Sequence, residues 1–261
     1  MIKKSLAALA LLVAMFAPGL SGAQMMSERQ ALIETFAQVE PSVGALYALE
    51  AQGNFKFLCS ATAVDRHEGQ TVILTAFHCT QKGVSYYVNF GDQVLRRAAV
   101  WKVPHYEVDE EKYPRIFNEP ETDMALFLME GEDVPVAPLA ETAVIANGAK
   151  VAMVGYPLGL SKIMYEGIVA GRFDRPGDDM YNYLLLQIFG APGSSGSAVV
   201  DVDSGEIVGV LVAAATSPIL PVIFATPIDY RKWLMPVLPE EAADVGAEGA
   251  DEAPKAGDDG S

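Results

Sequence analysis

Apolar residues along most of the chain occur in short runs of five to ten residues, separated by residues that favour turns. The runs are rich in β-branched and aromatic residues, which is typical of strands. They form two successive series, and no long helical segment lies between them, which favours two antiparallel β-barrels of six strands over a parallel α/β sheet. The fold class predicted is therefore all-β. The twelve expected strands are residues 44–49, 55–64, 71–76, 85–90, 98–103, 124–129, 150–156, 164–173, 183–187, 197–201, 207–213 and 222–227.

Both ends of the chain differ from this strand-rich middle. The sequence Ser-Glu-Arg-Gln at residues 27–30 has the form of a capping box, and apolar residues at helical spacing follow it. We therefore expect a short helix that begins there and ends before Pro41. Asp229 can cap a second short helix over residues 230–235. Residues 239–261 contain eight acidic residues, one lysine and no aromatic residue, which predicts disorder.

The first 23 residues have the features of a secretory signal peptide. Lys3 and Lys4 precede an apolar run at residues 6–17, and the small residues at 21–23 offer a cleavage site. The apolar run is too short to span about 30 Å of hydrocarbon. We therefore expect a secreted or periplasmic protein that is not held in the membrane once the signal is removed.

These patterns divide the chain into five expected segments. They are a signal peptide (1–23), an N-terminal helical segment (24–40), a first β-barrel (41–136), a second β-barrel (143–236) and an acidic disordered tail (237–261).

Composition and charge narrow the possible partners. Of the 261 residues, 51% are hydrophobic and 20% are charged, which is ample for a globular core. The formal net charge of -16 repels phosphate backbones and anionic lipid surfaces. We therefore expect neither nucleic acid nor membrane as a partner, and a protein or peptide substrate remains possible. The sequence leaves the oligomeric state open.

Three short strings carry the residue types of acyl-transfer chemistry: TAFHC at 75–79, TDMAL at 122–126 and GSSGS at 193–197. A catalytic serine needs an imidazole to take its proton, a carboxylate to orient the imidazole, and backbone N–H groups to stabilise the oxyanion. Each string alone is a weak indication, and together they supply each part once.

The order of these groups resembles that of the trypsin-like (chymotrypsin-fold) serine proteases, with 45 residues from His78 to Asp123 and 72 from Asp123 to Ser195. The resemblance implies that His78 is the general base and then the general acid, that Asp123 orients it, and that Ser195 is the nucleophile. It also implies an oxyanion hole formed by the N–H groups of Gly193 and Ser195, and no cofactor.

Within this family the second half of the chain is similar to the HtrA (Deg) branch. The similar strings are GYPLGL at 155–160, EGIV at 166–169, GEIVG at 205–209 and FATPI at 224–228. HtrA proteins typically carry a PDZ domain after the protease domain. Only about 25 residues follow the second predicted barrel here, too few for such a domain. We therefore expect a branch member without one.

The resemblance also implies a disulfide between Cys59 and Cys79, the only two cysteines, in an oxidising compartment. Two positions depart from the family pattern. Ser194 stands where trypsin has an acidic residue that pairs with a freed N-terminus, so activation by that ion pair is not expected. Ser197 replaces the glycine usual in the HtrA branch.

Two metal sites were considered as alternatives. Cys59, His67, His78 and Cys79 offer two sulfurs and two imidazoles, but their spacing matches no common zinc pattern. The acidic segment 102–121 could supply oxygen ligands for calcium, although a solvated loop is the favoured interpretation. We expect no metal. His67 is expected to be an exposed hairpin residue.

The substrate pocket is expected to involve Val212, Ala213 and Ala214, and no acidic residue occurs between residues 180 and 195. A basic substrate side chain would find no counter-charge there, so an apolar residue before the scissile bond is predicted. Two other functions stay open. One is a catalytically silent or partner-activated scaffold that acts as a binding module, and the other is an esterase that uses the same chemistry. The G-x-S-x-G hydrolase elbow is excluded, because residue 197 is serine and the order of the three groups differs.

Overall fold

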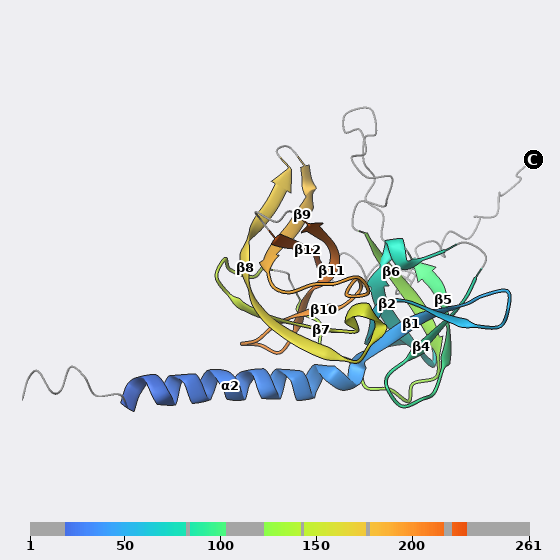
Figure 1. The fold of residues 1–261 in the computed structure, drawn as a ribbon, viewed down its shortest axis with the longest axis horizontal. Coiled ribbons are helices and arrows are strands. Elements are labelled where there is room, and N and C mark those ends of the chain that lie inside the picture. The colour runs from blue at the N-terminus through green and yellow to red at the C-terminus, as the bar shows by residue number, and fades with distance from the viewer. Residues whose placement is uncertain are drawn as a thin grey trace, which may run out of the picture.

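The computed structural model describes residues 19–81, 84–102, 123–141, 144–175, 178–216 and 221–228. Its strands form two closed barrels of six antiparallel strands each, which lie side by side (Figure 1). This confirms the all-β fold class and its two six-stranded barrels. The predicted helix at 230–235, the acidic tail and most of the predicted signal peptide lie outside the described residues.

The first barrel has its strands in the order β1-β2-β3-β6-β5-β4. The strands are β1 (Val43–Leu49), β2 (Phe55–His67), β3 (Gln70–Ala76), β4 (Ser85–Asn89), β5 (Arg96–Lys102) and β6 (Met124–Glu130). The second barrel has the order β10-β11-β12-β9-β8-β7. Its strands are β7 (Lys150–Gly155), β8 (Ile163–Arg175), β9 (Asp178–Gln187), β10 (Ala198–Asp201), β11 (Ile207–Thr216) and β12 (Pro221–Pro227).

The apolar core of the first barrel continues into the second. Leu46 and Phe127 from the first barrel are fully buried, and they belong to the same buried cluster as Val154, Ala198 and Val210 from the second. Each Å² of apolar surface that this contact removes from water stabilises it by about 25 cal/mol. Loops that end at this contact between the barrels are therefore held in place by packed side chains of the shared core.

An N-terminal helix, α2 (Gly19–Val39), precedes the barrels and extends beyond them (Figure 1). It begins earlier than the capping-box pattern predicts, so Ser27 lies inside the helix rather than at its N-cap. The helix is anchored at its C-terminal end, where Val39 is fully buried and the hydroxyl of Thr35 donates to the Val202 carbonyl over 3.3 Å. Among the described residues, no helix is long and apolar enough to cross a membrane.

Candidate active site

His78 and Asp123 lie at the ends of two neighbouring strands. β3 ends at Ala76 and the chain turns into the short 3-10 helix η2 (Phe77–Cys79), while Asp123 immediately precedes β6. Because Ala76 is paired with Met124, the register of one sheet brings the histidine and the aspartate together. The two residues are far apart in sequence, and this pairing is what makes them neighbours.

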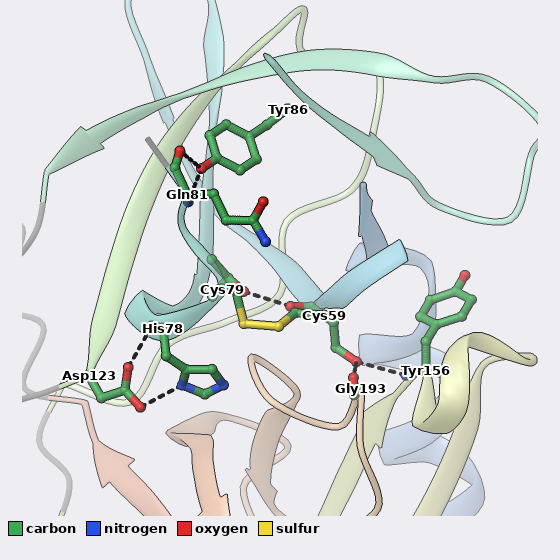
Figure 2. The surroundings of a disulfide bond; sticks show 10 residues. Cys59, His78, Cys79, Gln81, Tyr86, Asp123, Tyr156 and Gly193 are labelled. Carbon is green, nitrogen blue, oxygen red and sulfur yellow. Dashed lines mark hydrogen bonds and ion pairs between the residues drawn. A yellow bond between two sulfur atoms is a disulfide. The ribbon is translucent and has the colours of Figure 1, made fainter. Parts of the chain in front are cut away.

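Two hydrogen bonds join these residues, as Figure 2 shows. Oδ2 of Asp123 lies 2.7 Å from Nδ1 of His78, and Oδ1 of the same carboxylate accepts the His78 backbone N–H over 2.8 Å. The Asp123 carbonyl also accepts the Phe77 N–H over 2.9 Å. Asp123 has a φ of 46°, a left-handed conformation that aspartate tolerates better than most residues. The hydrogen bonds hold it there, which is typical of strain at a functional site.

This pairing fixes the state of the imidazole. A carboxylate can only accept a hydrogen bond, so Nδ1 carries a proton and Nε2 of the neutral ring is the acceptor. The Asp123 side chain is 9% exposed and that of His78 is 31% exposed. The carboxylate is therefore shielded, while the imidazole reaches toward the surface. A ring held in this way can take a proton from a nearby hydroxyl.

Cys59 and Cys79 form a disulfide, as the resemblance implied. Cys59 lies on β2 and Cys79 directly follows His78, so the bond ties the end of β3 to the neighbouring strand (Figure 2). A cross-link that closes a loop of this length stabilises a fold by about 3 kcal/mol.

The disulfide also bears on the metal-site alternative. Ligand atoms of Cys59, His78 and Cys79 lie within 4.8 Å of one another. The two sulfurs are bonded to each other, however, so they offer no thiolate to a metal ion. His67 lies in the β2–β3 hairpin as expected, where it pairs with Gln70. It is not fully exposed, because its side chain is 22% exposed and its ring lies 4.7 Å from that of Trp101. Residues 103–121 of the proposed calcium segment lie outside the described residues.

Ser195 lies in a turn over residues 191–197, which we call the serine turn. The Ser195 carbonyl accepts the N–H of Ser60 on β2 over 2.9 Å, so the turn is bonded to the first barrel. Gly196 has a φ of 80°, and a Cβ there would overlap the Ser60 carbonyl and the Thr75 hydroxyl. The turn therefore packs directly against the strand that leads into His78.

The serine turn uses its N–H groups selectively. Those that donate hydrogen bonds belong to Ala191, Ser194, Gly196 and Ser197. Pro192 has no N–H. Among the described residues, no protein acceptor takes the N–H groups of the remaining two, Gly193 and Ser195. Both residues are half-buried, so these two N–H groups are open to water or to an acceptor that arrives with a ligand.

The residues predicted for the substrate pocket differ in exposure. Val212 is buried within the core cluster, whereas Ala213 and Ala214 are exposed. All three lie on β11, whose register against β12 shifts between Leu211 and Ala213. The two alanines are therefore accessible from solvent, whereas the side chain of Val212 packs in the core.

Two residues that hold the serine turn were not among the predicted site residues. The buried Ser60 donates its hydroxyl to the Gly193 carbonyl over 2.9 Å, and the N–H of Leu158 donates to the Pro192 carbonyl over 2.7 Å. Leu158 belongs to the 3-10 turn η3 (Pro157–Gly159). Ser60 directly follows Cys59 in a predicted strand that also contains Lys56 and Thr62, so nothing in the sequence singles it out.

Known proteins resemble this chain in sequence. A protein named probable periplasmic serine endoprotease DegP-like from Pseudomonas fluorescens is 29% identical over 142 residues, which are 53% of this chain and 28% of that protein. A protein of the same name from Marinomonas sp. is 29% identical over 126 residues, which are 48% of this chain and 26% of that protein. The chain thus matches about a quarter of the length of these relatives.

Solved structures resemble it in fold. The HtrA-type protease AlgW with decapeptide matches with a TM-score of 0.56 and 19% identity, over 74% of this chain and 62% of that chain. The serine endoprotease from Yersinia pestis matches with a TM-score of 0.57 and 19% identity, over 74% of this chain and 61% of that chain. The profile of the trypsin-like peptidase domain matches residues 59–210, more than half of the sequence. The chain therefore belongs to the trypsin-like peptidase family.

Proposed function

We propose that this protein is an exported serine endopeptidase that hydrolyses peptide bonds through Ser195, His78 and Asp123 by way of an acyl-enzyme. Membership of the peptidase family and the hydrogen-bonded pair of His78 and Asp123 support the reaction class. The relatives named as periplasmic endoproteases support export, in keeping with the predicted signal peptide.

In the proposed mechanism, Nε2 of neutral His78 takes the proton of the Ser195 hydroxyl as Oγ bonds to the substrate carbonyl carbon. This hydrogen bond forms or tightens as substrate binds. The negative charge moves to the carbonyl oxygen, and His78 then gives its proton to the leaving amine nitrogen as the C–N bond breaks. Water attacks the resulting ester with the same base, which releases the acid and restores Ser195.

The observation that carries this proposal is the hydrogen-bond pattern of the serine turn, which leaves the N–H groups of Gly193 and Ser195 without a protein acceptor. In a trans peptide the carbonyl and the following N–H point in opposite directions. Leu158 binds the Pro192 carbonyl, so the Gly193 N–H is directed away from η3.

The second donor, the Ser195 N–H, is also oriented by a hydrogen bond to the carbonyl of its own peptide group. The Ser194 carbonyl accepts the N–H of Ser197 over 3.0 Å, so the Ser195 N–H of that peptide points to the opposite side. Both donors are thus fixed before substrate arrives, as an oxyanion hole requires. The loss of one such donor typically lowers kcat by about 10²–10³.

Substrate preference follows from what borders the serine turn. Gly190 packs closely on Ile223, since a Cβ at that glycine would be 2.8 Å from the Ile223 side chain. The exposed Ala213 and Ala214 lie on β11, where Ala214 pairs with Ile223 of β12, so this is an apolar setting. We therefore propose that the residue before the scissile bond is apolar. A related protease was solved with a decapeptide, which supports a peptide as the substrate.

The test compares the wild type with Ser195→Ala on an unfolded protein chain and on a small activated ester. We expect the wild type to cut the protein into fragments that end mainly in apolar residues, and the variant to cut neither substrate. Cleavage of the ester alone would indicate an esterase. Cleavage of neither by the wild type would indicate a silent or partner-activated scaffold, and cuts mainly after lysine or arginine would overturn the pocket assignment.

A further inference from the structure

Ser60 contacts the serine turn through both its hydroxyl and its backbone N–H. It lies on β2 directly after Cys59 and is fully buried. Its hydroxyl donates to the Gly193 carbonyl over 2.9 Å and accepts the N–H of Tyr156 over 2.8 Å. Its own N–H donates to the Ser195 carbonyl over 2.9 Å. One residue of the first barrel therefore holds the serine turn of the second barrel at two carbonyls, on either side of Ser194.

The position of these contacts matters because of the order of the peptide groups. Three consecutive peptide groups of the serine turn determine where the two free donors point. The first carries the Gly193 N–H, and its carbonyl, that of Pro192, accepts the N–H of Leu158. The third carries the Ser195 N–H, and its carbonyl is held within the turn. The peptide between them has the Gly193 carbonyl, which the Ser60 hydroxyl holds. Ser60 thus fixes the peptide that sets the angle between the two free donors.

Gly193 needs such an external contact. Its φ is 88°, and glycine is the residue with the greatest backbone freedom. The ring of Phe57, also on β2, fills the space beside it, since a Cβ at Gly193 would be 2.7 Å from Cε1 of that ring. Packing restrains the glycine on one side, and the hydrogen bond from Ser60 fixes the direction of its carbonyl.

The same short segment of β2 also reaches the acid–base pair. Cys59 is bonded to Cys79, which follows His78 (Figure 2). The Ser60 carbonyl accepts the hydroxyl of Thr75 over 2.7 Å. Two consecutive residues therefore connect the strand end that bears the imidazole with the turn that bears the nucleophile. A displacement of Ser60 would change the geometry between the two.

We propose that Ser60 is a positioning residue, whose hydroxyl orients the Gly193 peptide so that both N–H donors meet the developing oxyanion. This inference rests on the proposed peptidase function. It predicts that the hydroxyl acts on the transition state and leaves substrate binding in the ground state unchanged.

The experiment compares Ser60→Ala with Ser42→Ala. Ser42 is a matched control, because it is equally buried and its hydroxyl has no hydrogen-bond partner among the described residues. For each variant, kcat and KM are measured on a peptide substrate, together with the inhibition constant of a peptide aldehyde. The aldehyde forms a tetrahedral adduct with the catalytic serine, so its affinity reports on the oxyanion donors.

For Ser60→Ala we expect kcat to fall by about 10- to 100-fold, less than the loss of a donor outright, with KM within about twofold of the wild type. The aldehyde should lose affinity by a similar factor, and Ser42→Ala should match the wild type in all three constants. A lower Tm with kcat and aldehyde affinity unchanged would overturn the proposal, because Ser60 would then act only in stability.

A second pair of variants covers the case in which Ser60→Ala does not fold. Ser60→Thr and Ser60→Val have the same shape and differ in the hydroxyl, so kcat should be at least about 10-fold higher for threonine. Equal values would contradict the proposal. If the wild type itself neither cleaves peptides nor binds the aldehyde, the proposed peptidase function fails and this inference fails with it. Activity in the wild type with no effect at Ser60 rejects this inference alone.

Discussion

The two barrels contribute to the candidate site in different ways. In the first barrel, His78 and Asp123 stand at the ends of two directly paired strands, and three hydrogen bonds join these strand ends. In the second barrel, Ser195 lies in a turn between β9 and β10. That turn is held by its own hydrogen bonds and by contacts from Leu158 and from Ser60 of the other barrel.

This difference indicates where each half of the site is sensitive. The acid–base pair is set by the register of one sheet, so it depends on the folding of the first barrel. The serine turn depends in addition on the contact between the barrels. Changes to the reacting groups should therefore have the largest effects, changes to the link between the barrels smaller ones, and changes far from both the smallest.

The largest effect is expected for Ser195→Ala. Removal of the proposed nucleophile leaves the acid–base pair and the proposed oxyanion donors in place but gives them no covalent step to assist. The expected loss in kcat is about 10⁶-fold, measured on a peptide substrate. Residual activity above a hundredth of the wild-type value would mean that another group, such as Ser194 or Ser197, is the nucleophile.

The next largest effect is expected for Asp123→Asn, which tests the first barrel's half alone. The side-chain amide can donate a hydrogen bond to Nδ1, which favours the wrong tautomer of His78, and kcat should fall by about 10⁴-fold. Asparagine tolerates the left-handed backbone at this position, so the fold should persist, and a Tm measurement serves as the control. A loss smaller than 10-fold would show that Asp123 does not set the state of the imidazole.

A third prediction concerns the covalent link beside the site. Replacement of both Cys59 and Cys79 by alanine opens a loop with a sequence separation of 20 residues. The free energy of unfolding should fall by about 3 kcal/mol, because the unfolded chain gains conformational freedom. Denaturant titration measures it, with the reduced wild type as a second sample. An unchanged midpoint in both would show that the barrel is stable without the bond.

The smallest effect is expected for Arg96→Ala, away from both halves of the site. Hydrogen bonds from the Arg96 guanidinium lower the pKa of Asp92 and of Asp133 from the ordinary value of 3.8. The two carboxylates are largely exposed, so solvent screening limits the loss of stability to less than about 1 kcal/mol. Activity should stay at the wild-type level.

The loss of stability in Arg96→Ala should depend on pH in one direction. Because both folded-state pKa values are depressed, the ion pairs stabilise the protein at pH above the ordinary carboxyl pKa, and this contribution is lost as pH falls through the lowered values. The difference between the wild type and Arg96→Ala in denaturant titrations should therefore be full at pH 7 and vanish in acid. A difference that grew on acidification would contradict the assignment.

The sequence predicted the architecture well, because strands that bury one face carry a local pattern. The predicted strand boundaries were wrong where hydrogen bonding between main chains extends a strand beyond its apolar pattern. β9 was expected to begin at residue 183, yet it begins at Asp178, which pairs with Arg175 of β8 in an extended hairpin. The start of α2 at Gly19 was missed for a related reason, since a helix can continue through residues that carry no capping pattern.

The site was predictable to the extent that chemistry requires particular residue types in a particular order. His78 and Asp123 met this condition and lie in contact. Ser60 and Leu158 did not. The role of Ser60 depends on a contact between the barrels, and that of Leu158 on a contact between segments far apart in the sequence. Leu158 also contributes a backbone N–H, which any residue type except proline could supply.

The most direct test of the central claim is covalent labelling with a fluorophosphonate, followed by mass spectrometry of the labelled peptide. If Ser195 is activated by His78 and its oxyanion donors are in place, the wild type should be labelled on Ser195 alone, and His78→Ala should react far more slowly. Labelling of Ser194 or Ser197 instead, or a wild type that reacts no faster than His78→Ala, would contradict the account.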